Sequence, residues 1–182
     1  MRKTVCYLLL LMSVILTACS VDSETDLTVA DAQKAYNDAK GSYKGIVMVD
    51  NVPATVYMNV DQEFTIRDLP VTPLLRRFLS GEELDAAVAS VKERIFKAPT
   101  SSMIIIGDLV YVTMEPTDWI FTATAGNEKY DVSALMSVTI CYSHTYDNLS
   151  ASIIVDELFC NGQKADLSSN TISWLIDEAL RQ

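Results

Sequence analysis

The 182-residue sequence lacks several features that common protein functions require. Basic side chains are few, since 14 lysine and arginine residues stand against 24 aspartate and glutamate residues, and the formal net charge is −10. This balance excludes a nucleic-acid partner, because contacts with phosphates need clustered basic side chains. The six glycines are scattered and form no phosphate-binding loop. No apolar run reaches the roughly 20 residues of a membrane-spanning helix.

Residues that carry chemistry are equally scarce. His144 is the only histidine, and no Gly-x-Ser-x-Gly motif presents a serine nucleophile to it. One histidine and the two cysteines that follow Cys19 are too few for a usual four-ligand zinc site. We therefore expect no catalytic residue, no metal and no cofactor. A hydrolase that uses carboxylates alone remains an alternative, in which acids such as Asp156 and Asp177 meet only in the folded chain.

The first residues have the pattern of an export signal. Arg2 and Lys3 precede residues 5–16, a segment of 12 residues in which Ser13 is the one polar side chain. As a helix this segment spans about 18 Å, too short for a hydrocarbon core of about 30 Å. The pattern predicts a signal peptide and not a membrane span.

The residues that follow the apolar segment, from Leu16 through Thr17 and Ala18 to Cys19, resemble the lipobox of bacterial lipoproteins. The resemblance implies that Cys19 is the lipid attachment site, that a signal peptidase for lipoproteins removes residues 1–18, and that acyl chains (palmitate among them) anchor the protein to the membrane. Several acyl chains suffice for stable anchoring. The alternative is that Cys19 is only a small residue near an ordinary cleavage site.

Residues 19–27 form an acidic tether. Asp22, Glu24 and Asp26 alternate with small polar residues, and their like charges oppose collapse of the segment. The stretch is similar to the acidic segment that follows the lipidated cysteine in surface lipoproteins of Bacteroidetes. This resemblance implies a location on the outer membrane at the cell surface, and the alternative is the periplasmic face of the same membrane.

Residues 28–182 contain no repeat and no flexible linker, and their pattern predicts a single globular domain. Thr28 is expected to cap a helix that runs to about Lys40. Short alternating segments then predict antiparallel strands. The eight candidates are residues 43–50, 54–61, 63–69, 102–106, 109–115, 118–125, 134–146 and 150–159.

Two further helical regions are expected. An insertion at residues 72–97 begins with Pro73, continues with a capping box from Ser80 to Glu83, and is expected to end before Pro99. Asn170 is expected to cap a C-terminal helix. Its apolar face would consist of Ile172, Leu175, Ile176, Ala179 and Leu180.

The expected fold class is therefore α+β and mainly antiparallel β, with an eight-stranded meander that is barrel-like or strongly curved. Gly41-Ser42-Tyr43 is similar to the Gly-x-Trp start of calycin and lipocalin-like barrels. The overall plan resembles small outer-membrane lipoproteins of Bacteroidetes that have no assigned activity. We expect a packed interior, with any binding at the loops or beneath the inserted helices at residues 74–95. The expected interior residues are Val56, Met58, Val60, Ile66, Ile105, Val110, Val112, Ile140 and Ile154.

Cys141 and Cys160 are expected to remain free thiols. A turn centred on Asp147 and Asn148 places Cys160 about 20 Å along the strand from the residue that faces Cys141. That distance exceeds the Cα separation of about 7 Å that a disulfide allows.

These observations favour a non-catalytic binding or interaction module on the outer membrane. The first alternative is a structural or assembly protein of the cell envelope, and the second is the carboxylate-based hydrolase. The identity of a ligand or protein partner stays open.

We predict that Cys19→Ala blocks lipidation, because the lipid is attached through the thiol. The variant should stay unprocessed or leave the membrane fraction, which cell fractionation followed by immunoblotting would detect. Partition of the variant into the outer membrane at the level of the wild-type protein would contradict the lipoprotein interpretation.

Overall fold

The computed structural model of the protein describes residues 29–182. The expected signal peptide, Cys19 and the acidic tether lie outside the described residues. The helices are α2 (Val29–Ala39), α3 (Thr72–Leu75) and α4 (Gly81–Ser90). The strands are β1 (Gly41–Val49), β2 (Val52–Val60), β3 (Glu63–Arg67), β4 (Ile95–Ile106), β5 (Leu109–Met114), β6 (Thr117–Ala125), β7 (Glu128–Ser143), β8 (Asn148–Cys160), β9 (Gln163–Lys164) and β10 (Ser173–Arg181).

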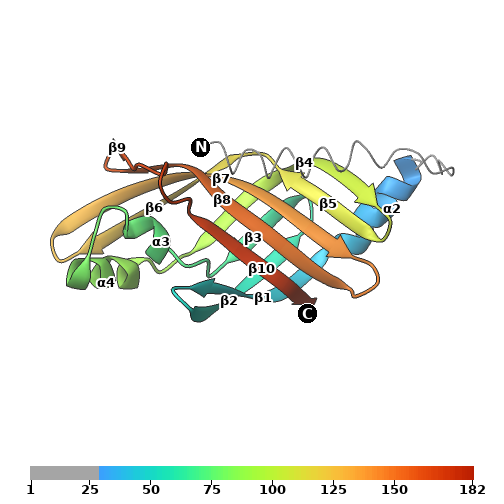
Figure 1. Ribbon diagram of the computed structural model, residues 1–182, viewed down its shortest axis with the longest axis horizontal. Helices are drawn as coiled ribbons and strands as arrows, with labels where there is room; N and C mark the ends of the chain where they lie inside the picture. Colours follow the sequence, from blue (N-terminus) through green and yellow to red (C-terminus); the bar gives the residue numbers. More distant parts are fainter. Residues whose placement is uncertain (1–28) are drawn as a thin grey trace.

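Eight of these strands close into an antiparallel barrel, which confirms the expected fold class (Figure 1). The order around the barrel is β1-β2-β3-β4-β5-β7-β8-β10, and β10 then pairs with β1. From β1 to β5 each strand pairs with the next one along the chain, because short turns favour antiparallel neighbours. The turn at Gly107 has the positive φ, 61°, that its sequence predicts.

The barrel interior is filled by the inward-facing side chains of alternating strand positions. Val56, Ile66, Val110, Val112 and Ile140 are fully buried, and Met58 and Val60 are 2% exposed. The expectation was wrong for Ile154, which is 39% exposed, because Ile153 and Val155 take the inward positions of β8. Ile105 is only half-buried near the end of β4.

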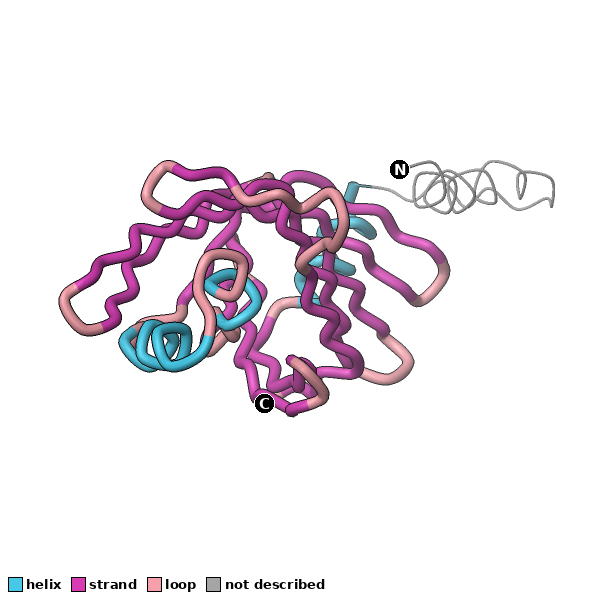
Figure 2. The backbone as a smooth tube through the Cα atoms, turned by 60° about the vertical axis from the view of Figure 1, so that its left-hand side comes forward, coloured by secondary structure: helices cyan, strands magenta, loops and turns pink. Residues whose placement is uncertain are grey.

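Helices cover the two ends of the barrel, as Figures 1 and 2 show. At the end where β1 begins, Ala35 and Ala39 of α2 are buried, and the Tyr36 hydroxyl donates to the backbone oxygen of Asp61. At the opposite end, Leu74 and Leu75 of α3 are fully buried. The N-terminal helix and the start of the helical insertion are thus confirmed, although Ser80 makes no side-chain capping bond to α4.

Beyond the barrel, β6, the first half of β7 and the second half of β8 project as a sheet that we call the wing (Figure 1). Helix α4 packs on one face of the wing through Leu84 and Ala87. The Tyr130 hydroxyl of β7 donates to the Glu83 carboxylate of α4, and this bond raises the pKa of Tyr130 to about 12. The insertion therefore belongs as much to the wing as to the barrel.

The C-terminal helix that the sequence predicts is wrong, since residues 173–181 form strand β10. The buried side chains Ile172, Trp174 and Ile176 alternate with exposed ones, as a strand between two neighbours requires. A bulge with a positive φ of 49° at Glu178 then shifts Ala179 inward. Because a bulge interrupts the alternation of buried and exposed residues, the buried residues Ile172, Ile176 and Ala179 have the spacing of one face of a helix.

The expected end of the helical insertion is also wrong. Helix α4 ends at Ser90, and β4 starts at Ile95 and contains Pro99. Pairing of β4 with β3 outweighs the helical spacing of Ile95, which lies opposite Arg67. Pro99 is tolerated in this strand because its ring nitrogen faces away from β3, so the ladder between β3 and β4 loses no hydrogen bond.

The turn between β7 and β8 lies at residues 144–147, earlier than expected. Cys141 pairs with Ser150, and Cys160 pairs with Val132 at the far end of the wing. Both thiols are free, as expected. Burial raises the pKa of each thiol.

Closure of the barrel depends on a close contact between β1 and the bulge in β10. Gly45 is buried, and a Cβ atom there would lie 2.4 Å from Cγ2 of Ile176 and 3.1 Å from Cβ of Ala179. At the end of the same seam, Arg181 lies over the rings of Tyr43 and Tyr142, 5.1 and 5.4 Å from their centroids.

We predict that Gly45→Ala lowers the free energy of unfolding by about 1–3 kcal/mol, because the added methyl group overpacks the seam. Urea denaturation followed by circular dichroism measures the change. Thr55→Ala, at an exposed position of β2, is the control and should change stability by less than about 0.5 kcal/mol. Equal stability of the two variants would mean that β10 does not pack on Gly45.

Candidate functional site

Strands β4 and β6 separate from each other like the arms of a fork. The last bond at the base of the fork runs from the Glu115 backbone N–H to the Pro99 oxygen, at 2.9 Å. From there β4 stays paired with β3, whereas the chain after β5 continues as β6 on the edge of β7. No pairing joins β4 to β6 in the described part of the chain.

The edge of β6 that faces the fork carries unpaired backbone groups. Ala125 and Glu128 flank the two-residue turn to β7, so Ala125 and every second residue before it bond to β7. The alternate residues, Asp118, Ile120, Thr122 and Thr124, direct their N–H and C=O groups away from β7. The Thr124 N–H confirms this direction by donating to Oγ of Ser90 at 2.7 Å.

The edge of β4 that faces β6 also carries unpaired backbone groups. Arg94 and Phe96 lie at the positions that bond to β3, as the 2.9 Å bond from the Asp68 N–H to the Arg94 oxygen shows. Ile95 and Lys97 therefore direct their backbone groups into the fork. Within residues 29–182 these groups have no hydrogen-bond partner, and neither do those of Asp118, Ile120 and Thr122 on the outward edge of β6.

Between the two edges lies a groove of about 660 Å³, which we call the fork groove. Its walls are residues 91–93 and 95–97 on one side and residues 118–122 on the other. Three buried aromatic rings lie along it: the centroids of Phe96 and Trp119 are 6.5 Å apart, and those of Trp119 and Phe121 are 5.2 Å apart. Rings in this arrangement offer a rigid apolar surface.

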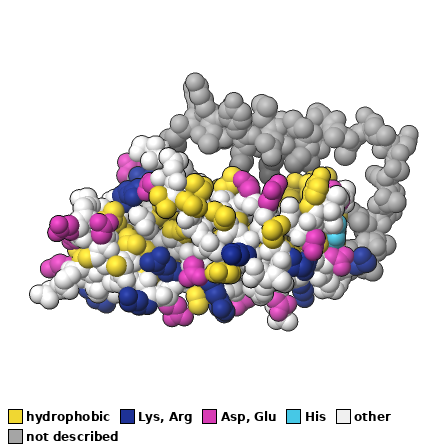
Figure 3. Space-filling model, turned by 90° about the horizontal axis from the view of Figure 1, so that it is seen from below, with side chains coloured by type: hydrophobic (Ala, Val, Ile, Leu, Met, Phe, Trp, Pro, Cys, Tyr) yellow, Lys and Arg dark blue, Asp and Glu magenta, His cyan; other side chains and the backbone are white. Residues whose placement is uncertain are grey.

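Charges around the fork groove balance one another. Lys92 and Lys97 stand against Glu93 and Asp118. Lys97 also pairs with Glu63 at 2.8 Å, and both side chains are half exposed. Basic and acidic side chains are likewise interspersed on the side of the molecule seen in Figure 3. The groove thus has no strong preference for a charged ligand.

The structure does not bring the residues considered for catalysis into one site. His144 lies 3.9 Å from the Asp38 carboxylate and edge-on to Tyr142, while Oγ of Ser143 donates instead to Asp108. Asp156 accepts a bond from Ser137, and the neighbouring Glu157 pairs with Lys164. Each of these acids has a structural partner of its own.

Among residues 29–182, no group of three or more histidine, cysteine or acidic side chains is placed to hold a metal ion. In the same range, no helix has the length and apolar character needed to cross a membrane. No known protein family, curated protein or solved structure matches this chain.

The sequence predicts any binding at the loops or beneath the inserted helices at residues 74–95, and it does not identify the fork groove. Residues 91–93 and Ile95, which follow α4, do form part of one wall. The opposite wall comes from β6, which the sequence predicts only as one more strand. Pro116, next to Glu115 at the base of the fork, is the single local signal that the strand is interrupted there.

Proposed function

We propose that the protein is a lipid-anchored binding module of the bacterial envelope, and that the fork groove binds an extended segment of a partner polypeptide as an added strand. The observation that carries the proposal is the pair of open strand edges that face each other across an aromatic-lined groove. A polypeptide in extended conformation presents the matching N–H and C=O groups at the right spacing.

Exposed strand edges usually carry features that prevent pairing with other chains, such as lysine, proline or a covering element. No lysine or proline lies on the outward edge of β6 between Asp118 and Thr122, and no element of residues 29–182 covers it there, whereas β4 across the groove carries Lys97 and Pro99. Ile120 on the β6 edge is 73% exposed. An open edge retained beside a groove favours a binding role. Main-chain bonds would supply affinity, and apolar side chains of the guest strand would lie against the exposed side chain of Ile120 and the partly exposed ring of Phe121.

The expected location supports the same function. A lipid on Cys19 and an acidic tether would hold the domain at the membrane while leaving the groove free to meet a partner. The lipobox and the tether carry this part of the proposal, which places the domain on the outer membrane at the cell surface.

An assembly role is the second candidate, and one observation favours it. Met48 of β1 and Leu175 of β10 lie on the outer face of the barrel, where they are 57% and 60% exposed, and Ile46 on the same face is 56% exposed. Adjacent exposed apolar side chains favour contact with another protein. Sedimentation of the protein as a dimer that Leu175→Asp converts to a monomer would support this candidate.

We predict that Ile120→Pro abolishes strand addition without unfolding the protein. The N–H of Ile120 points into the fork, so proline removes a donor for the guest strand and no bond to β7. The control is Ile120→Thr, which keeps the backbone donor. The measurement is the affinity of decapeptides selected on the wild-type protein from a random library, which should fall at least about tenfold for the proline variant only.

Two results would contradict the proposal. One is selection of peptides that bind the wild-type protein and Ile120→Pro equally well. The other is a selection in which Ile120→Pro weakens the binding of none of the selected peptides, although circular dichroism shows that Ile120→Pro and Ile120→Thr are both folded.

Surface location has its own test. Replacement of Asp22, Glu24 and Asp26 together by alanine should reduce cleavage of the protein by protease added to intact cells, because the acidic residues would direct export. Lipidation should be unchanged, as metabolic labelling with palmitate would show. Equal cleavage of variant and wild-type protein would mean that the acidic residues act only as a solvated spacer.

A further inference from the structure

The fork groove is open at one end and closed at the other. At its base the Glu115 N–H donates to the Pro99 oxygen at 2.9 Å, and beyond this bond β4 pairs with β5. The inner side of the groove is filled by the side chains of Phe96 and Trp119, which are 1% and 4% exposed. A strand that lies between β4 and β6 therefore cannot continue past the base in the plane of the sheet. The base is suited to a chain that ends there.

Two prolines at the base remove the hydrogen-bond donors that a continuing strand would need. The backbone groups of Lys97 on β4 and of Asp118 on β6 point into the fork. Two residues closer to the base along each arm, the chain has Pro99 and Pro116. Proline has no N–H, and the Pro99 oxygen already accepts the bond at the base. Lys97 and Asp118 thus carry the last main-chain groups that a guest strand can meet.

These last backbone groups match either end of a guest strand. Strand β4 runs toward the base, so the innermost group of Lys97 is its C=O, whereas β6 runs away from the base and the innermost group of Asp118 is its N–H. An amino end antiparallel to β4 can donate to the Lys97 oxygen, and a carboxyl end antiparallel to β6 can accept from the Asp118 N–H. The direction of the guest strand is therefore decided by charge.

The base of the fork groove is negatively charged. Lys97 is neutralised by Glu63, at 2.8 Å. Asp118 accepts a bond from the Ser133 hydroxyl at 3.3 Å, and Glu115 is exposed. Neither of these two acids takes part in an ion pair within residues 29–182. Since the opposite charges at the open end of the groove cancel, the base attracts an ammonium group and repels a carboxylate.

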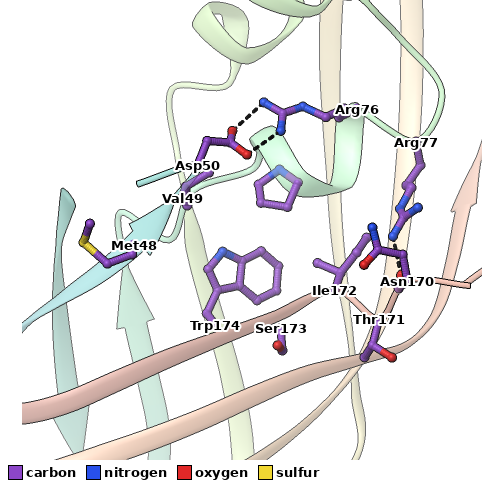
Figure 4. Close-up of a pocket in the computed structure, with 11 residues that line it drawn as sticks. Met48, Val49, Asp50, Arg76, Arg77, Asn170, Thr171, Ile172, Ser173 and Trp174 are labelled. Atoms are coloured by element: carbon purple, nitrogen blue, oxygen red, sulfur yellow. Dashed lines mark hydrogen bonds and ion pairs between the residues drawn. The ribbon is translucent and has the colours of Figure 1, made fainter. Parts of the chain in front are cut away.

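A second pocket, of about 300 Å³, lies beside α3 and also contains a carboxylate, that of Asp50 (Figure 4). Arg76 binds this carboxylate through two bonds, of 2.7 and 2.6 Å, which hold the pKa of Asp50 below its ordinary value. Arg77 belongs to the same lining and makes its net charge positive. An ammonium group is therefore repelled from this pocket, in contrast to the base of the fork groove.

We propose that the guest strand is the amino-terminal end of its partner, with the free ammonium group at the base of the fork groove. The ammonium group donates to the Lys97 oxygen and lies near the Asp118 carboxylate, and the chain runs outward, antiparallel to β4 and parallel to β6. This inference rests on the strand addition proposed above. Pairing with β6 ends after Thr122, because the Thr124 N–H already donates to Ser90. The site thus takes roughly five residues of extended chain.

Two random decapeptide libraries test the inference. Both have amidated carboxyl ends, and they differ only in the amino end, which is free in one library and acetylated in the other. Each library is selected on the full-length protein in detergent micelles, and the affinity of each selected sequence is then measured in both forms. The free form should bind at least about tenfold more tightly, because acetylation removes the charge and adds bulk at the closed end.

A glycine extension separates a chain end from an internal segment. Four glycines added before the amino end of the tightest sequence keep a free ammonium group but require the chain to pass the base. The affinity should therefore fall about tenfold. The matched control carries the four glycines at the carboxyl end, where they lie beyond the open end of the groove and should leave the affinity unchanged.

Asp118→Asn tests the position of the ammonium group. The ratio between the affinities of the free and acetylated forms should fall about threefold, the size expected for one exposed charge pair. The control is Glu128→Gln, which removes an exposed acid at the start of β7 outside the fork groove and should leave the ratio unchanged. Both forms are measured on the same preparation, so loss of folded protein does not alter the ratio.

The possible results separate this inference from strand addition itself. If free and acetylated forms bind equally and Ile120→Pro still abolishes their binding, strand addition stands and the inference is overturned. Full affinity of the peptide extended at its amino end would overturn it too, since the guest would then be an internal segment. An unchanged ratio in Asp118→Asn would contradict the position of the ammonium group. If neither library yields a sequence whose binding depends on Ile120, strand addition fails and the inference fails with it.

Discussion

The contact between Gly45 of β1 and the bulge of β10 is the constraint on which the rest of the structure depends. Only glycine leaves room there for Ile176 and Ala179, and their approach lets the last strand pair with the first. At the end of the same seam the Arg181 guanidinium bonds to Asp147 at 2.7 Å and to the backbone oxygen of Lys40 at 2.6 Å. These bonds fix helix α2 and the β7–β8 turn to the closed barrel.

Closure also explains why the fork groove exists. Strand β7 has 16 residues and β5 has six, so one edge of β7 takes two partners in succession, first β6 and then β5. Strand β4 pairs with β5 through residues 100–106 and with β3 through residues 95–99, so its first half turns away from β5 to complete the barrel. The edges of β4 and β6 must therefore separate beyond Glu115. The open edges are a consequence of joining a closed barrel to a longer wing.

Much of the fold follows from local patterns in the sequence. The alternation of Val56, Met58 and Val60 and the turn at Gly107 are enough to predict a meander, because neighbouring strands with short turns pair with each other. The C-terminal segment could not be predicted in this way. Ile172, Ile176 and Ala179 fit a helix, and only the neighbouring strands β1 and β8 make the strand the better solution.

The candidate site depends on contacts between residues that are distant in the chain. Phe96 and Trp119 belong to different strands, and no spacing in the sequence shows that their strands separate to leave a groove. The same holds for Lys97 and Asp118, which lie at the closed end of the groove on β4 and β6. Sequence patterns indicate which side of a strand is buried, but they do not show which strand edge lacks a partner.

Amide hydrogen exchange, resolved by residue in the free protein, tests the central claim most directly. The fork requires that the amides of Asp118, Ile120 and Thr122 exchange rapidly, because no acceptor within residues 29–182 faces them. The amides of Trp119 and Phe121, which bond to β7, should be protected by at least about a hundredfold more. Slow exchange at Ile120, equal to that of its two neighbours, would mean that the edge of β6 is already paired and would contradict the account.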